Sequence, residues 1–171
     1  MRRYPFKMKG ISTYETGFPP VYDADSRVLI LGSFPSVKSR EIQFYYGHKQ
    51  NRFWKTICGY FHEDIPQDVE GKRKFLLRNK VALWDIARAC EIVGSSDASI
   101  KNVEVVDLSE ILAKTKLEKI FLNGNLAYQL FLKEYEKLDI PYQKLPSTSP
   151  ANPRFSSQVW TEALDGIFRN A

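Results

Sequence analysis

Two polar segments of the sequence combine residue types that can hold a flat, charged ligand. The first interleaves aromatic, basic and amide side chains and reads Phe44-Tyr45-Tyr46-Gly47-His48-Lys49-Gln50-Asn51-Arg52-Phe53-Trp54. Such a mixture suits a planar heterocycle stacked on an aromatic ring, with phosphates held by Arg or Lys. Phe53 and Trp54 begin a helical apolar repeat, so we expect these two in the core and Asn51 at the helix start.

The second segment, Leu145 to Phe155, has three hydroxyl residues in a row between prolines. Ser147, Thr148 and Ser149 are followed by Asn152 and Arg154. Prolines stiffen a loop, and hydroxyl and backbone N–H groups suit phosphate oxygens. The segment is therefore either a phosphate-binding loop or a rigid surface turn.

Candidate polar residues also follow two short apolar runs. Gly32-Ser33-Phe34-Pro35-Ser36 comes after residues 28–31, and its small residues let a backbone approach a ligand closely. Asp85 closes the run at 81–84, where a buried carboxylate is costly without a partner. Asp85 either contacts a ligand or has a structural role, in which it bonds backbone amides or pairs with Arg88.

The elements that must position these residues alternate between strand and helix. Apolar runs at 28–31, 81–84, 119–122 and 142–145 predict strands buried on both faces. Helical patterns follow them, and the pattern as a whole predicts a three-layer α/β/α fold around a central, mainly parallel four-stranded sheet. In such sheets, ligands bind outside the carboxyl ends of the strands. All the candidate residues above lie at that edge. Residues 1–27 are expected to form an N-terminal arm and residues 90–102 a long loop.

Composition narrows the function further. The 171 residues suit one domain, and no apolar run approaches the roughly 20 residues of a membrane helix. No secretory h-region follows the basic start, so we expect a cytoplasmic protein. We also expect it to be a monomer. Two cysteines and two histidines exclude a disulfide scaffold, a four-cysteine iron–sulfur site and a closed zinc site built by histidines alone. The net charge of +5 permits nucleic-acid binding without establishing it.

Several of these motifs resemble the uracil-DNA glycosylase superfamily. They are V-L-I-L-G-S-F-P-S, F-Y-Y-G-H-K-Q-N-R-F-W-K and L-P-S-T-S-P-A-N, supported by V-A-L-W-D-I and F-L-N-G. Within the superfamily they look like the DNA-deoxyinosine (hypoxanthine-DNA) glycosylases, over about residues 18–160. The mismatch-specific branch shares N-R-F-W-K, but its first motif is G-I-N-P-G with a catalytic Asn. Phe34 stands at that place here and cannot polarise water, which argues against that branch.

The resemblance implies a monofunctional DNA glycosylase that hydrolyses the N-glycosidic bond of a deaminated base, hypoxanthine first, in base excision repair. Its partner would be damaged DNA with the target nucleotide flipped into a pocket. Water is the nucleophile, and no metal or cofactor is implied. The alternatives are a uracil or mismatch-uracil glycosylase, or a catalytically silent DNA-damage or single-strand binder on the same fold.

By the same resemblance, Asn51 is the catalytic residue. The segment from Leu145 to Phe155, called the hydroxyl loop below, would contact the DNA backbone. The expected base pocket consists of Gly32, Ser33, Phe34, Pro35, Phe44, Tyr45, Tyr46, His48 and Asp85. The expected DNA-binding residues are Ser147, Thr148, Ser149, Asn152 and Arg154.

Overall fold

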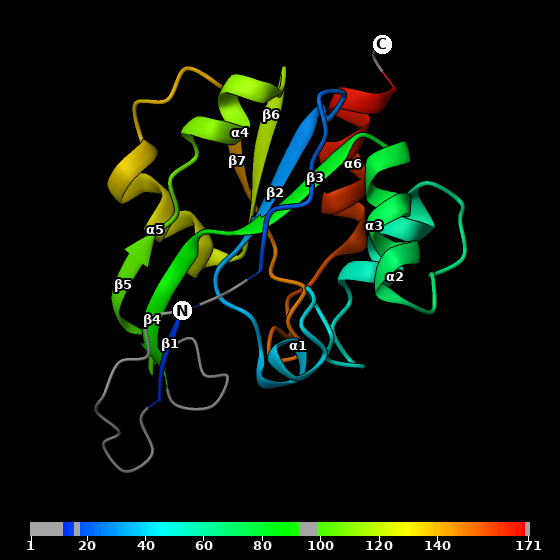
Figure 1. Cartoon of the computed structure of the whole chain (residues 1–171). Helices are drawn as coiled ribbons and strands as arrows, with labels where there is room; N and C mark the ends of the chain where they lie inside the picture. The colour runs from blue at the N-terminus through cyan, green and yellow to red at the C-terminus, as the bar shows by residue number, and fades with distance from the viewer. Residues whose placement is uncertain (1–11, 16–17, 93–98, 170–171) are drawn as a thin grey trace.

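The computed structural model describes residues 12–15, 18–92 and 99–169, and its central feature is a four-stranded parallel sheet (Figure 1). The strand order is β3-β2-β6-β7, and every neighbouring pair is parallel. The predicted fold class is therefore confirmed. The strands are β2 (Val28–Gly32), β3 (Val81–Asp85), β6 (Lys119–Asn123) and β7 (Tyr142–Leu145).

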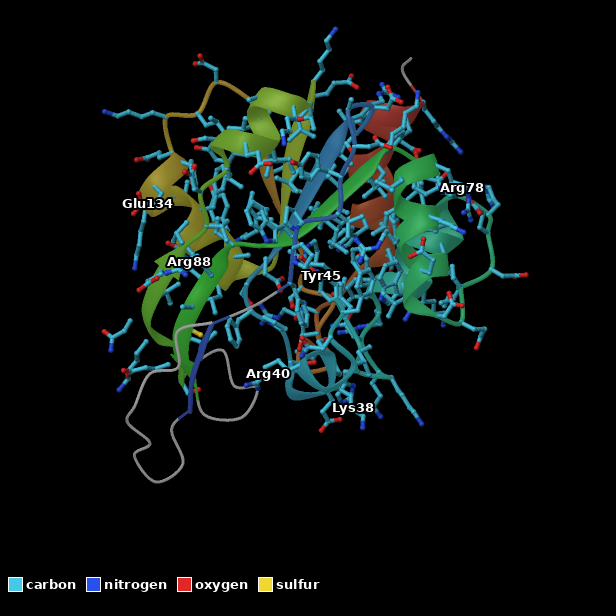
Figure 2. All side chains as sticks on the ribbon, in the orientation of Figure 1. Lys38, Arg40, Tyr45, Arg78, Arg88 and Glu134 are labelled. Atoms are coloured by element: carbon cyan, nitrogen blue, oxygen red, sulfur yellow. The ribbon has the colours of Figure 1, made fainter. Side chains whose placement is uncertain are left out.

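The central strands are apolar throughout because they bury both of their faces. Val28 and Ile30 belong to one hydrophobic core, and Leu29 and Leu31 to the other. Successive side chains of a strand point to opposite faces, so an uninterrupted apolar run fills two cores at once. Side chains accordingly fill the space on both faces of the sheet (Figure 2).

Helices cover each face. The first core packs against α2, α3 and α6, and the second against α4 and α5. Helix α1, which the sequence did not predict, lies beyond the carboxyl ends of the strands; Ser36 caps it by accepting the Ser39 N–H at 3.1 Å. The helices are α1 (Val37–Ile42), α2 (Phe53–Tyr60), α3 (Val69–Arg78), α4 (Ser109–Lys114), α5 (Asn125–Tyr135) and α6 (Ser157–Phe168).

A second sheet corrects the expectation of a long loop at residues 90–102. Strands β1 (Ser12–Glu15), β4 (Ala87–Ile92) and β5 (Lys101–Val105) form an antiparallel sheet in the order β1-β4-β5. The stretch 93–98 of the expected loop lies outside the described residues. Strand β4 reads A-R-A-C-E-I, which has little intrinsic strand preference, so its conformation comes from pairing on both edges rather than from its own residues.

The arm at residues 1–27 is partly built into the fold. Phe18 and Val21 are buried in the first core, and Val21 exchanges two backbone hydrogen bonds of 2.9 Å with Leu83 on β3. Residues 1–11 and 16–17 of the arm lie outside the described part.

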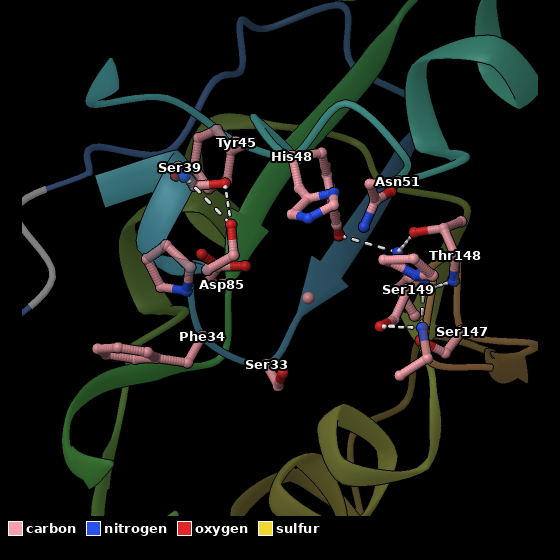
Figure 3. A pocket seen from close by; sticks show the side chains of 17 residues that line it. Ser33, Phe34, Ser39, Tyr45, His48, Asn51, Asp85, Ser147, Thr148 and Ser149 are labelled. Atoms are coloured by element: carbon pink, nitrogen blue, oxygen red, sulfur yellow. Dashed lines mark hydrogen bonds between the residues drawn. The ribbon is translucent and has the colours of Figure 1, made fainter. Parts of the chain in front are cut away.

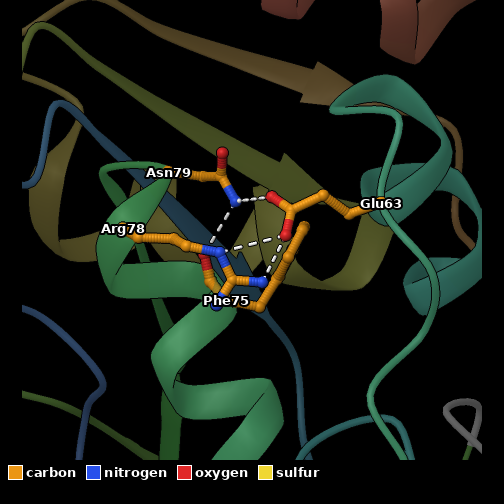
Figure 4. A network of polar contacts seen from close by, with 4 residues as sticks. All are labelled: Glu63, Phe75, Arg78 and Asn79. Carbon is orange, nitrogen blue, oxygen red and sulfur yellow. Dashed lines mark hydrogen bonds and ion pairs between the residues drawn. The ribbon is translucent and has the colours of Figure 1, made fainter.

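A polar network holds the end of α3 just before β3 begins (Figure 4). Glu63 accepts from Arg78 Nε at 3.0 Å and from Asn79 Nδ2 at 2.8 Å, and Asn79 also donates to Phe75 O. The Arg78 guanidinium lowers the pKa of the Glu63 carboxyl. This network ties Glu63, which lies between α2 and α3, to the C-terminal end of α3.

Candidate active site

A cavity of about 260 Å³ opens at the carboxyl edge of the parallel sheet (Figure 3). Its volume lies just below the range of ordinary ligand pockets, which is about 300–1,000 Å³. The turn after β2, the segment leading to α2, the ends of β3 and β6, and the hydroxyl loop all contribute to its walls. The lining residues are Gly32, Ser33, Phe34, Pro35, Ser36, Ser39, Tyr45, Tyr46, His48, Asn51, Asp85, Asn123, Ser147, Thr148, Ser149, Pro150 and Ala151.

Asn51 presents an amide to this cavity from the start of α2. Its Oδ1 accepts the Phe53 N–H at 2.9 Å, which satisfies one of the unpaired donors of the helix end. Arg52 rather than Asn51 is the residue directly before the helix. Asn51 therefore caps the helix as expected, but from one residue further from its start. Because the oxygen is held, the amide nitrogen faces the other way. Among the described residues, no hydrogen-bond partner is found for that nitrogen.

The turn at residues 48–51 fixes the position of Asn51. The His48 carbonyl accepts the Asn51 N–H at 3.0 Å, and His48 Nδ1 accepts the Gln50 N–H at 3.1 Å. A neutral His48 therefore carries its proton on Nε2. His48 lies beside Asn51 at the cavity, as expected from the sequence (Figure 3).

Tyr46 forms an aromatic and polar part of the wall. Its ring stacks on Phe53 with centroids 4.2 Å apart and an interplanar angle of 22°. Its hydroxyl accepts a hydrogen bond of 3.0 Å from Asn123 Nδ2. Burial raises the pKa of Tyr46 well above its ordinary value, so this group stays protonated and retains a hydrogen to donate.

The neighbouring aromatic residues differ in position, and one expectation is wrong. Phe44 does not line the cavity, because its ring is buried in the first core, stacked on Trp54 at 6.1 Å. Tyr45 lines the cavity but is 2% exposed, and its hydroxyl donates to Pro19 O at 2.8 Å. Aromatic residues favour interiors as much as binding sites, so the sequence could not separate Phe44 from its neighbours.

Phe34 lies in the turn after β2 and lines the cavity, as expected. It is partly buried, and the Arg40 guanidinium carbon lies 5.6 Å from its ring centroid, over one side of the ring. Ser33 and Pro35 flank it and also line the cavity.

Asp85 is the acidic residue among the described residues that line the cavity, and it is buried. It is 5% exposed, and its Oδ2 has no hydrogen-bond partner among the described residues. The structural alternatives considered for it are not found, because Arg88 pairs with Glu104 and no backbone amide donates to Oδ2. Burial raises the pKa of the Asp85 carboxyl from 3.8 to about 7.

Gly32 makes room for that carboxyl. Gly32 and Asp85 are register partners on β2 and β3. A Cβ at position 32 would lie 2.5 Å from Asp85 Oδ1 and 2.7 Å from the Tyr46 hydroxyl, which is closer than such atoms can approach. Glycine is required here because two polar side chains converge on the backbone.

The hydroxyl loop is fixed to the sheet through Thr148. Its N–H donates to Asn123 Oδ1 and its Oγ1 accepts from Asn123 Nδ2, both at 3.0 Å, while its carbonyl accepts the Arg52 N–H at 3.0 Å. Thr148 is 1% exposed. Thr148 is therefore an anchor of the loop, and its burial argues against the phosphate contact expected for it.

Arg52 holds the same loop from the side of α2. Its guanidinium donates to the carbonyl of Ser149 and to that of Asn152, the latter at 2.8 Å, and lies 4.4 Å from the Phe155 ring centroid. A guanidinium has several donors in a fixed plane, so one side chain can hold several carbonyls.

The remaining loop residues divide into two kinds. Ser147 and Ser149 line the cavity, and each hydroxyl accepts a backbone N–H at 3.2 Å, which leaves its own hydrogen to donate. Asn152 lies outside the cavity and stiffens the loop, donating to Ser147 O and accepting the Arg154 N–H. Arg154 is exposed, and no ion pair of its guanidinium is found within the described residues.

Comparison with known proteins identifies the family. Residues 19–165 match the family model described as the uracil DNA glycosylase superfamily. The chain belongs to this superfamily.

Relatives agree with this membership. A protein of Methanosarcina acetivorans named hypoxanthine DNA glycosylase is 38% identical over 161 residues, which cover 90% of this chain and 98% of the relative. A protein of the same name from Methanosarcina barkeri is 38% identical over 157 residues, covering 86% of this chain and 96% of its own. Both the superfamily and the branch that the motifs predicted are thus confirmed.

A solved structure shares the fold. The solution NMR structure of a Methanosarcina acetivorans protein, provisionally classed as a uracil DNA glycosylase, has a TM-score of 0.74 and 35% identity. It covers 94% of this chain, and the alignment spans 98% of that protein.

Three residues that hold this site together, Ser39, Arg52 and Asn123, had no role assigned to them from the sequence. Ser39 is 1% exposed, and its Oγ accepts the Gly47 N–H at 2.8 Å, which ties α1 to the aromatic segment. Asn123 and Arg52 hold the hydroxyl loop, as described above. Asn123 had a signal, since it ends a predicted strand at the binding edge, whereas the partners of Ser39 and Arg52 arise only from tertiary contacts.

In the described ranges, no helix is long and apolar enough to cross a membrane. The same ranges contain no cluster of three or more His, Cys, Asp or Glu side chains placed to hold a metal ion.

Proposed function

We propose that this protein is a monofunctional DNA glycosylase that hydrolyses the N-glycosidic bond of deoxyinosine and releases hypoxanthine. One observation carries the proposal. The amide nitrogen of Asn51, for which no hydrogen-bond partner is found in the described part of the chain, faces a cavity of about 260 Å³ that the buried Asp85 carboxyl also lines. The relatives named hypoxanthine DNA glycosylase, aligned over nearly their whole length, support hypoxanthine as the base.

Asn51 acts on the departing base in this proposal. As the C1′–N9 bond breaks, its electron pair leaves with the base, so positive charge develops on the sugar and negative charge on the base. Water then adds to C1′, and the proton that it loses balances the negative charge of the released base. A fixed N–H donor aimed at the base stabilises that negative charge without reorganising. The second lone pair of Oδ1 can also orient the attacking water. The Phe53 N–H holds the amide in place for both tasks.

Water, rather than an amine of the protein, is the proposed nucleophile. Among the described residues that line the cavity there is no lysine. A Schiff-base intermediate, which needs a lysine at the sugar, is therefore not part of the proposal.

The hydroxyl loop is proposed to contact the phosphates that flank the flipped nucleotide. Ser147 and Ser149 retain hydroxyl hydrogens at the cavity, and Arg154 is exposed nearby on the same loop. Thr148, Asn123 and Arg52 hold the loop in place, so its donors are arranged before DNA binds. Such contacts give affinity without sequence preference.

Two aromatic residues remain candidates for stacking on the base. Phe44 is buried away from the cavity, and Tyr45 uses its hydroxyl and ring in the core. Phe34 and Tyr46 have rings at the cavity wall. We propose that one of these two stacks on the flipped base, a contact worth about 1–3 kcal/mol.

Single-turnover assays with excess protein test the function. Duplexes that carry one deoxyinosine, deoxyuridine or deoxyxanthosine are incubated with the chain, and free base is measured. We expect hypoxanthine release at a rate that no protein-free control reaches. Binding without release of any base would show a damage-binding protein instead of an enzyme.

Uracil is the second candidate base, because the structural neighbour is provisionally classed as a uracil DNA glycosylase. Release of uracil but not hypoxanthine in the same assay would favour it and would contradict the leading proposal.

A further inference from the structure

The Asp85 carboxyl is buried in the site without anything that explains its burial. It is 5% exposed, its Oδ2 has no partner in the described part of the chain, and the nearest basic residue along the chain, Arg88, pairs with Glu104 instead. Leaving a buried polar atom unpaired costs about 1–3 kcal/mol, and more for a charge. A group kept at that cost in a binding cavity is explained if the ligand supplies the missing partner.

The position of the carboxyl is specific as well as buried. Gly32 has no side chain, and the space that its Cβ would fill is bounded by Asp85 Oδ1 and the Tyr46 hydroxyl. The two polar groups thus converge beside Gly32, in the wall of the cavity. Asn123 holds Tyr46 there through its hydroxyl.

We propose that the Asp85 carboxyl recognises the ring N–H of the flipped base, so that the pocket rejects adenine and cytosine, which lack this N–H. This inference rests on the proposed glycosylase function and extends it to a substrate class. Hypoxanthine and xanthine carry an N1–H beside the O6 carbonyl, and uracil carries the equivalent N3–H. Adenine has a bare N1 acceptor at that place and cytosine a bare N3. A carboxyl oxygen accepts a hydrogen bond from the ring N–H of hypoxanthine, xanthine or uracil. In adenine and cytosine it faces a ring nitrogen that is itself an acceptor.

The protonation state of Asp85 affects both the rate of base release and the discrimination against adenine. A neutral carboxyl accepts N1–H and donates its own hydrogen to O6, where negative charge collects as the base departs. An ionised carboxyl still accepts N1–H but repels that charge. Only the neutral form can donate to adenine N1. Burial places the pKa of Asp85 at about 7, so both forms exist near neutral pH.

Few other groups titrate around Asp85. Tyr45 and Tyr46 face it from the segment before α2, and burial raises the pKa of each well above the neutral range. His48 lines the same cavity, and β2, β6 and the hydroxyl loop contribute Gly32, Asn123 and Thr148, which carry no charge. A variant of His48, the histidine that lines the same cavity, is therefore the control for any change of rate with pH.

Substrates modified at the ring nitrogen test the contact directly. N1-methyldeoxyinosine replaces the N–H by a methyl group that collides with Asp85. We expect the wild-type chain to release this base at least tenfold more slowly than hypoxanthine. In Asp85→Ala the lost carboxyl leaves room for the methyl, so the ratio of N1-methyl to unmodified rates should rise at least tenfold.

Two outcomes overturn the inference while the proposed function stands. One is equal wild-type release of both bases, and the other is an unchanged rate ratio in an Asp85→Ala chain that unfolds cooperatively. If the wild type releases neither hypoxanthine, uracil nor xanthine, the proposed function itself fails, and this inference falls with it.

A pH series with Asp85→Asn gives an independent check that preserves the side-chain shape. Wild-type release of hypoxanthine should fall at least tenfold between about one unit below and two units above the pKa of Asp85. Asp85→Asn should abolish that fall and lower the ratio of hypoxanthine to adenine release. His48→Gln should keep the fall. Loss of the fall in His48→Gln, with persistence in Asp85→Asn, would assign the titration to His48 and contradict the proposal.

Discussion

The Asn51 amide has its two ends in different surroundings, and this difference makes its chemistry testable. The oxygen is occupied by the Phe53 N–H of α2, whereas the nitrogen faces the cavity. Aspartate at this position would keep an oxygen on Phe53 and place a second, charged oxygen where the donor stood. That oxygen would repel the negative charge of the leaving base.

We therefore predict that Asn51→Asp lowers single-turnover release of hypoxanthine at least a hundredfold while the fold survives. Loss of one fixed donor to a developing anion costs about 10²–10³ in rate in other enzymes. Urea unfolding checks the fold, with Asn51→Ala as the comparison, because Ala loses the helix-start contact, worth about 1 kcal/mol. A near wild-type rate for Asn51→Asp would remove Asn51 from the chemistry.

Asp85 should lower the stability of the protein in a pH-dependent way. Its pKa is raised from 3.8 to about 7 on folding. Below about pH 4 both the folded and the unfolded chain are protonated at this group, so it contributes no penalty. As pH rises toward 7 only the unfolded chain ionises, and the folded state loses stability until both forms are ionised.

We predict that Asp85→Asn raises the free energy of unfolding by on the order of 2–4 kcal/mol at about pH 8 and changes it little near pH 4. Urea titrations across this range measure the difference. Asp139→Asn, at an exposed aspartate, serves as the control and should show no such trend. A gain that is the same at both pH values would mean that ionisation of Asp85 is not its source.

At the scale of elements, the hydroxyl loop should bind DNA through charge as well as hydroxyl groups. Arg154 is exposed on this loop, beside a cavity at the carboxyl edge of the sheet. Each phosphate that a cation neutralises releases counterions and adds about one unit to the slope of log affinity against log salt concentration.

We predict that Arg154→Ala reduces that slope by about one unit on undamaged duplex as well as on an inosine duplex. Lys116→Ala is the matched control, because Lys116 is exposed just before β6, at the opposite edge of the sheet. Fluorescence anisotropy over a salt series measures both. Equal slopes for Arg154→Ala and the wild type would place Arg154 away from the DNA backbone.

Elements with a clear hydrophobic pattern in their own sequence were predictable. Elements whose conformation depends on contacts with neighbouring elements were not. Val28–Leu31 is apolar throughout, which only a strand buried on both faces requires, so the central sheet followed from sequence. Strand β4 mixes small and charged residues without a regular pattern and acquires its conformation from β1 and β5. The site divides in the same way. Strand-end residues such as Asp85 were predictable from position, but the clamp of Arg52 on the loop depends on contacts about a hundred residues away.

At the scale of the whole molecule, two hydrophobic cores share one sheet. The first contains Trp54 and Trp160, and the second contains Leu130 of α5. Both cores use alternate residues of the same central strands, so neither can be lost while the sheet persists intact. We therefore expect residues 18–92 and 99–169 to unfold as one cooperative unit, which would support the single domain expected from the length.

Leu130→Ala tests this coupling across the sheet. The substitution removes a side chain that is 4% exposed in the second core, and we predict a loss of about 2–5 kcal/mol of unfolding free energy. In a Trp84→Phe background, tryptophan fluorescence reports only on Trp54 and Trp160 in the first core. Both cores use the same strands, so the loss of unfolding free energy affects the whole chain. The urea midpoint measured by fluorescence should therefore shift as far as the midpoint measured by circular dichroism. A fluorescence transition that stays at the midpoint of the Trp84→Phe parent, while the dichroism transition shifts or splits, would show that the two faces of the sheet unfold separately.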